Sequence, residues 1–197
     1  MHRVLTLLFL LSSIINFAQL KVTAEDFQSN LNKEFADAKT SPLTAEDRNI
    51  FKALDFFAID TDFIVEAKLV KSKNEKSFAM KTTTDRTPLY VKYGVVSFKI
   101  KGEDFQLNVY QNLDLIKRPG FKKHLFLPFT DLTSGDQTYG GGRYIDLEIP
   151  KGETITIDFN QAYNPYCTYN PKYSCPVVPA ENDLIIQVNA GVKKFHD

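Results

Sequence analysis

The chain has 197 residues, of which 43% are hydrophobic, and its 24 Lys and Arg residues balance its 24 Asp and Glu residues. This length and composition predict one domain with a substantial core, because the chain is short for two. A formal net charge of zero, with no run of Lys and Arg on one face, argues against nucleic acid as a partner.

Residues 1–18 are expected to be a signal peptide rather than part of the fold. A short basic start is followed by an apolar run at 4–15, and Ala18 is a small residue suited to cleavage before Gln19. The run is short for a bilayer and no second one follows, so no membrane span is expected after cleavage. The sequence therefore predicts a protein exported to the periplasm or beyond.

The N-terminal part of the mature chain, residues 19–58, is predicted to be helical. Residues 23–36 carry apolar side chains at helical spacing, and a second helix is expected over 45–54. Thr44 and Asp47 resemble a capping arrangement at the start of this second helix. The second helix is expected to bury three side chains, Ile50, Phe51 and Leu54.

The rest of the chain, residues 59–197, changes to an alternating apolar and polar pattern typical of half-buried strands. Strands are predicted at 63–69, 77–82, 91–101, 105–111, 124–129, 143–149, 154–160 and 184–189. The turn around Gly102 makes one clear hairpin. The pattern predicts a mainly β fold, with the single globular domain of residues 19–197 forming an antiparallel β-barrel or sandwich of about seven or eight strands with the two short N-terminal helices packed on it.

The short turn at residues 150–153 is expected to join strands 143–149 and 154–160 into a second hairpin. In that arrangement Arg143 and Asn160 would be near neighbours. Arg143 also falls on the apolar face of its strand, where a charged group needs a partner or water.

A long connection, residues 158–182, holds both cysteines, four of the nine tyrosines and four of the nine prolines. Connections of this length are usually functional or cross-linked. Turns at Asn164-Pro165 and Asn170-Pro171 favour an ordered loop that covers one end of the barrel.

Cys167 and Cys175 are expected to form a disulfide across this loop, because thiols oxidise outside the cytoplasm. The loop between them is short, so the bond would contribute about 2.5 kcal/mol. A zinc site would need further ligands, for which the mature chain offers only His124 and His196, and no metal is expected. A catalytic cysteine with His124 as its base stays open but has no local signature.

The mature chain carries Phe129-x-Asp131-x-Thr133-x-Gly135, Thr138-Tyr139-Gly140, Gly142-Arg143-Tyr144, Asp158-Phe159-Asn160, Tyr163-Asn164-Pro165, Cys167, Cys175-Pro176, Glu181-Asn182 and Ala190-Gly191. Earlier motifs are Ser41-Pro42-Leu43 and Leu54-x-Phe56-Phe57. As a combination these resemble the bacterial domain-of-unknown-function family 1684 over nearly the whole mature chain. Since that family has no known activity, the resemblance implies neither a catalytic residue nor a cofactor.

The candidate ligand-binding residues are polar groups that the predicted strands bring toward one end: Arg143, Asp158, Asn160, Asn164, Tyr163, Asp131 and Tyr139. If Arg143 pairs with Asp131 or Asp158 away from solvent, the pair is structural and holds the long loop to the barrel. If the pair lines a cleft, the guanidinium is suited to a small anionic or sugar-like ligand.

The sequence thus predicts an exported, non-catalytic binding or structural module, whose partner would be a small polar ligand, a glycan or a protein. The alternative is a hydrolase that uses Asp158 or Asp131 as general base, with Arg143, in a cleft under the long loop. No nucleophile elbow, zinc-protease or phosphate-loop motif is present. No cofactor is expected, and the sequence does not define an oligomeric state.

Overall fold

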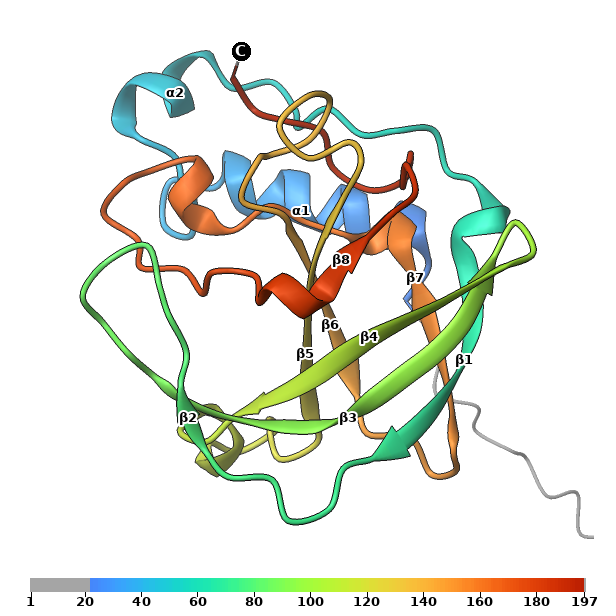
Figure 1. Ribbon diagram of the computed structural model, residues 1–197. Coiled ribbons are helices and arrows are strands. Elements are labelled where there is room, and N and C mark those ends of the chain that lie inside the picture. The colour runs from blue at the N-terminus through green and yellow to red at the C-terminus, as the bar shows by residue number, and fades with distance from the viewer. Residues whose placement is uncertain (1–21, 197) are drawn as a thin grey trace, which may run out of the picture.

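A curled sheet of eight strands, with helices and irregular segments across its open top, forms the protein (Figure 1). The computed structural model describes residues 22–196, so the expected signal peptide lies outside the described residues. The strands are β1 (Ile64–Lys71), β2 (Phe78–Ala79), β3 (Leu89–Ile100), β4 (Glu103–Asn112), β5 (His124–Asp131), β6 (Arg143–Glu148), β7 (Thr154–Asp158) and β8 (Asp183–Leu184). The mainly β, largely antiparallel fold expected from the alternating pattern is confirmed.

Within residues 22–196, the helices are two α-helices and five single turns of 3-10 helix. They are α1 (Ala24–Ala36), α2 (Ala45–Ile50), η1 (Thr61–Phe63), η2 (Leu115–Lys117), η3 (Phe159–Gln161), η4 (Tyr166–Thr168) and η5 (Ala180–Asn182). Among residues 22–196, no helix is long and apolar enough to cross a membrane.

The hairpin of β3 and β4 forms as the sequence predicts. Ile100 pairs with Glu103, and both turn residues have positive φ, 49° at Lys101 and 88° at Gly102. Two successive positive φ angles define the tight turn whose twist matches that of the flanking strands, and glycine adopts such an angle without steric cost.

The sheet order is β6-β5-β4-β3-β1-β7, which corrects the expected hairpin between β6 and β7. β7 pairs instead with β1, where Val65 lies opposite Ile157 and Ala67 opposite Ile155. This pairing places the apolar side chains of β7 on the same face as those of β1. The alternating sequence pattern alone is equally compatible with β7 pairing to β1 or to β6. Because only the short link 149–153 joins β6 to β7, the sheet must curl until its two edge strands approach each other.

The core lies inside the curl. It is built from alternate residues of the strands, including Val65, Ala67, Val96, Phe98, Ile100, Leu107, Val109, Leu125, Leu127, Phe129, Ile145, Ile155 and Ile157. Phe98 and Phe105 face each other across the hairpin with ring centroids 6.2 Å apart.

The strand predicted at 77–82 is reduced to β2 (Phe78–Ala79), and two further predicted elements are shorter than expected. α2 ends at Ile50, whose side chain is 76% exposed, so its predicted burial is wrong, whereas Leu54 is buried from an extended segment. β8 covers only Asp183–Leu184, although Val188 further along is fully buried. In both segments the apolar side chains are held by tertiary contacts rather than by continued regular structure.

The N-terminal helices pack on the long connection and on the C-terminal segment. Phe35 of α1 lies edge-on to Tyr169, with ring centroids 4.7 Å apart. Phe35, Leu43, Leu54, Tyr169 and Val192 form a second buried cluster. The long connection is therefore sandwiched between helices and sheet, as its red-orange course in the upper left of Figure 1 shows.

Candidate functional site

Arg143, the central residue of the predicted site, is fully buried and serves the fold. Its Nη2 lies 2.8 Å from an Asp131 carboxylate oxygen, and neither side chain is exposed to solvent. Nη2 also donates to the carbonyl of Val188 at 2.9 Å, and Nη1 donates to the carbonyl of Ala190. The guanidinium thus fastens the C-terminal segment, rather than the long connection, to β5 and β6.

Asp131 completes this buried network. Its Oδ1 accepts hydrogen bonds from the backbone and hydroxyl of Thr133 at 2.8 and 2.6 Å, and from the Val188 amide at 3.2 Å. Gly142, immediately before Arg143, has a φ of 84°, and a Cβ there would lie 2.5 Å from the Phe129 carbonyl oxygen. Only glycine allows the chain to enter β6 this close to β5.

The other polar candidates on and beside the long connection also hold backbone. Asp158 accepts from the Asn160 amide at 3.0 Å and from Gln161 at 3.1 Å, so it caps η3. Asn160 bridges the amide and carbonyl of Asp60 at 3.0 and 2.9 Å. Asn164 donates to the Lys193 carbonyl at 3.0 Å. The structure does not gather these residues with Arg143 around one ligand-sized space.

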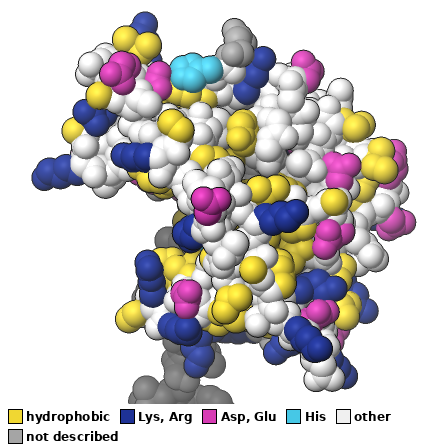
Figure 2. Space-filling view, turned by 60° about the vertical axis from the view of Figure 1, so that its left-hand side comes forward, with side chains coloured by type: hydrophobic (Ala, Val, Ile, Leu, Met, Phe, Trp, Pro, Cys, Tyr) yellow, Lys and Arg dark blue, Asp and Glu magenta, His cyan; other side chains and the backbone are white. Residues whose placement is uncertain are grey.

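An aromatic cleft of about 450 Å³ lies on another part of the surface. It opens between α1, the residues His124 and Phe126 of β5 with Tyr144 and Asp146 of β6, and the long connection. Its walls include Phe27, Leu31, Glu34, Tyr90, His124, Phe126, Tyr144, Asp146, Tyr163, Tyr166, Tyr173, Cys175 and Pro176. The surface in Figure 2 is hollowed at its left-hand edge, on this side of the molecule.

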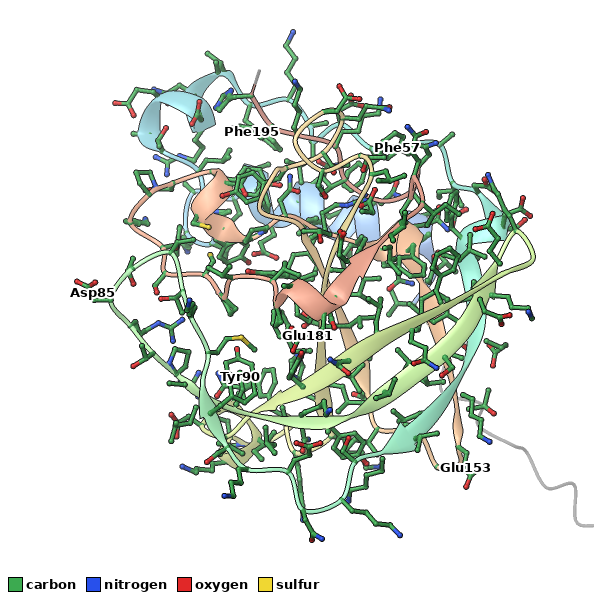
Figure 3. The ribbon with its side chains drawn as sticks, in the orientation of Figure 1. Phe57, Asp85, Tyr90, Glu153, Glu181 and Phe195 are labelled. Atoms are coloured by element: carbon green, nitrogen blue, oxygen red, sulfur yellow. The ribbon has the colours of Figure 1, made fainter. Side chains whose placement is uncertain are left out.

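The aromatic cleft rests on a third buried cluster, on the face of β4, β5 and β6 opposite the main core. Tyr90, Tyr110, Phe126 and Tyr144 are its large rings, and Phe126 and Tyr144 meet edge-to-face with centroids 4.7 Å apart. Figure 3 shows Tyr90 turned toward the interior, while Asp85 stands at the outer tip of the loop before β3. Both faces of this part of the sheet are therefore covered.

Three polar side chains form a chain of hydrogen bonds along the wall of the aromatic cleft. His124 Nε2 lies 2.9 Å from one oxygen of Asp146, and the Tyr163 hydroxyl donates to the other oxygen at 2.8 Å. Burial and the adjacent carboxylate raise the pKa of Tyr163 well above its ordinary value, so its proton stays in place. His124 Nδ1 is buried and has no hydrogen-bond partner within the described chain.

A second carboxylate, Glu34, accepts a hydrogen bond from the Tyr166 hydroxyl at the other side of the aromatic cleft. Burial, followed by the hydrogen bond to Glu34, raises the pKa of Tyr166. No Lys or Arg is among the described residues that line this space. The aromatic cleft thus combines tyrosine faces with two carboxylates and one imidazole.

Of the seven candidate ligand-binding residues from the sequence, only Tyr163 lines the aromatic cleft, although Cys175, which was predicted to form a disulfide, lines it too. His124 was considered only as a metal ligand or catalytic base, and Glu34 and Asp146 were missed. One signal for the cleft was available in the sequence. Phe126 and Tyr144 are large rings on the faces of β5 and β6 that the two-residue alternation assigns to solvent. Aromatic residues on both faces of a strand indicate that both faces are covered.

Cys167 and Cys175 are free thiols in the structure, so the predicted disulfide is not formed there. They are nevertheless neighbours, because the Cys167 amide donates to Cys175 Sγ at 3.1 Å. Tyr139, the remaining candidate from the sequence, has its hydroxyl beside the Cys167 sulfur, and burial raises the pKa of that phenol. Among residues 22–196, no cluster of three His, Cys, Asp or Glu side chains is arranged to hold a metal ion.

Comparison with known proteins gives a family but no activity. Residues 49–193 match the model of a protein family described as "Protein of unknown function (DUF1684)". The solution structure of the uncharacterized protein from gene locus rrnAC0354 of Haloarcula marismortui is similar, with a TM-score of 0.67 and 34% identity, over 86% of this chain and 91% of that one. A search of curated proteins finds no match. The chain therefore belongs to the DUF1684 family of proteins of unknown function.

Proposed function

We propose that this protein is a binding module that takes a small ligand with a flat or apolar body and a hydrogen-bond-donating, neutral or positively charged group. The observation that carries the proposal is the aromatic cleft, whose lining includes Glu34, Asp146 and His124 but neither Lys nor Arg. Its volume of about 450 Å³ is within the range of small-molecule sites.

The aromatic walls supply most of the expected affinity. Tyr166 and Tyr173 lie with ring centroids 5.3 Å apart, and Tyr144 and Tyr163 are perpendicular with centroids 5.9 Å apart. Aromatic rings bury a large area at low cost in conformational entropy, and their faces attract cations. These properties favour a ligand ring or alkyl body between the tyrosines.

The carboxylates set the preferred charge. Asp146 and Glu34 each accept a hydrogen bond from a tyrosine hydroxyl, which orients the carboxylate. Each carboxylate can still accept further hydrogen bonds from a ligand. An anionic ligand would meet two negative groups without a compensating Lys or Arg from the lining. A site centred on Arg143 would prefer an anionic ligand, whereas the aromatic cleft is expected to prefer a neutral or positively charged one.

The hydrolase alternative has less support. Asp131 is enclosed by Arg143 and Thr133, Asp158 caps η3, and neither carboxylate lines the aromatic cleft. A general base must reach the proton that it removes. We therefore prefer binding without catalysis.

The proposal is tested with two probes of similar shape and opposite charge, phenethylamine and phenylacetate, in equilibrium titrations. The amine is expected to bind more tightly, and Glu34→Gln and Asp146→Asn are each expected to weaken its binding roughly two- to fivefold, the range for partly exposed charge pairs. Glu148→Gln, on the same strand as Asp146 but outside the aromatic cleft, is the matched control. Equal binding of both probes, or tighter binding of the acid, would refute the proposal.

We infer further that the protein acts outside the cytoplasm after removal of residues 1–18, and that Cys167 and Cys175 become bridged there. The N-terminal pattern and the proximity of the thiols support this inference. Intact mass of exported protein, with and without alkylation, measures both features. Retention of residues 1–18, or two alkylatable thiols in exported protein, would count against it.

A further inference from the structure

We propose that Cys167 and Cys175 form a redox-active dithiol, in which Cys167 attacks a small disulfide and Cys175 resolves the product. This activity is separate from ligand binding in the aromatic cleft and does not depend on it. Two cysteines that are only a structural cross-link need no difference between their thiols, whereas an exchange site needs one thiol ready to attack and one to follow.

The first argument is the set of donors that surrounds the Cys167 sulfur. Cys175 is its neighbour, since the Cys167 amide donates to Cys175 Sγ at 3.1 Å, and the side chains of Thr83 and Tyr139 lie beside it. Thr83 is fixed to the same segment, because its amide donates to the Cys175 carbonyl at 2.9 Å and its hydroxyl accepts from the Cys175 amide at 3.1 Å. The donors are thus supplied by three separate parts of the chain.

The second argument is the asymmetry between the two thiols. Hydrogen bonding from Cys175, together with that from Thr83 and Tyr139, lowers the pKa of Cys167 to about 6 against the opposing effect of burial. The pKa of Cys175 is raised, first by its hydrogen bond to Cys167 and then by burial. The titratable groups that face Cys167 are Cys175, Tyr139 and Tyr144. These opposite directions of the two pKa shifts favour ionisation of Cys167 before Cys175.

The third argument is access. Cys167 is partly exposed, while Cys175 is buried and borders the aromatic cleft. A small disulfide can reach Cys167 from solvent, and Cys175 lies beside it, where it can react with a group attached to its neighbour.

The reaction balances as thiol-disulfide exchange. The Cys167 thiolate forms a bond to one sulfur of the small disulfide, whose own S–S bond breaks and releases one thiolate. Cys175 then loses its proton and attacks the Cys167 sulfur, which forms the protein disulfide and releases the second thiolate. One released thiolate takes up the proton that Cys175 loses, and the other takes up from solvent the proton that Cys167 gave up on ionising, so the protein dithiol is oxidised and the small disulfide is reduced to two thiols.

The test uses reduced protein, oxidised glutathione and mass spectrometry of the whole chain. The wild type is expected to lose about 2 Da without retaining glutathione, as exchange followed by resolution requires. Cys175→Ser is expected to accumulate a stable glutathione adduct at Cys167, and Cys167→Ser is expected to react far more slowly. An adduct mainly at Cys175, or no reaction of the wild type, would overturn the proposal.

Alkylation rates as a function of pH separate a reactive site from two accidentally close thiols. At pH 6, Cys167 in Cys175→Ser is expected to react roughly tenfold faster than an unperturbed thiol, after allowance for the lower nucleophilicity of a low-pKa thiolate. Cys175→Ala, which removes the donor that serine keeps, and Thr83→Val are expected to shift the midpoint of the rate profile upward. An ordinary thiol midpoint in Cys175→Ser would overturn the assignment of Cys167 as the attacking group.

Discussion

At the scale of the single residue, Arg143 shows why a charged side chain can occupy the core of this protein. Its partners are the Asp131 carboxylate and the carbonyls of Val188 and Ala190, and the Phe129 ring lies 5.2 Å from its guanidinium carbon. A buried charge is tolerated when it is paired and hydrogen-bonded in this way. Arg143, the central ligand-binding candidate from the sequence, is thus bound by other groups of the protein itself.

Arg143→Met is therefore expected to destabilise the fold by about 3–5 kcal/mol, because it leaves the buried Asp131 without a counter-charge. Urea unfolding followed by circular dichroism measures the loss. The double variant Arg143→Met with Asp131→Leu is expected to recover part of it, since no unpaired charge remains. An unchanged unfolding midpoint in Arg143→Met would show that the pair does not hold the C-terminal segment.

At the scale of the element, Asn182 joins β4 and β5, two neighbouring strands with few backbone hydrogen bonds between them. β4 and β5 pair only at Tyr110 and Phe126, and Pro128 further along β5 cannot donate a hydrogen bond. The fully buried Asn182 side chain fills this gap. It accepts from the Asn108 amide at 3.0 Å and donates to the carbonyls of Asn108 at 2.9 Å and Pro128 at 2.6 Å.

Asn182→Ala is expected to destabilise the protein by about 2–4 kcal/mol, because it leaves buried backbone groups of both strands without partners. Glu181→Ala, at the exposed neighbouring position, is the matched control and is expected to change stability little. Hydrogen exchange should show faster exchange of amides in β4 and β5 in the first variant alone. Equal stability of both variants would contradict the role given to Asn182.

The elements that the sequence predicts well are those whose determinants are local. The β3–β4 hairpin follows from alternation on both sides of one short turn, and the cap of α2 follows from Thr44. The predicted partner of β7 was wrong, because two-residue alternation defines which residues share a face but not which strand lies beside them.

The aromatic cleft was not predictable in the same way. Glu34, Tyr90, His124, Asp146 and Tyr163 belong to five separate segments, and no spacing in the sequence links them. Only the curl of the sheet and the course of the long connection bring them together. The DUF1684 resemblance, which the family match confirms, carried no information about them, because the family has no assigned activity.

At the scale of the whole molecule, buried tyrosines tie stability to pH. Burial raises the pKa of Tyr90, Tyr144, Tyr163, Tyr166 and Tyr169, and raises that of Tyr110 to about 12. In the unfolded chain these phenols ionise near pH 10. Between that value and the folded pKa, the unfolded state has lost protons that the folded state keeps.

Stability is therefore expected to be unaffected by these phenols below pH 10 and to fall steadily above it. Urea unfolding at pH 9 and pH 11, with phenolate absorbance recorded in parallel, measures the effect. Most of the phenolate signal is expected to appear together with unfolding. A complete phenolate transition near pH 10 in protein that stays folded would contradict the burial of these side chains.

The central claim is that the aromatic cleft is the binding surface of this protein, and chemical-shift mapping with phenethylamine tests it most directly. The account predicts saturable shifts concentrated on His124, Asp146, Tyr163 and Tyr166, which phenylacetate at the same concentration does not reproduce. Shifts that cluster on another surface, such as around Arg143 and the C-terminal segment, or no saturable shifts in the aromatic cleft, would contradict it.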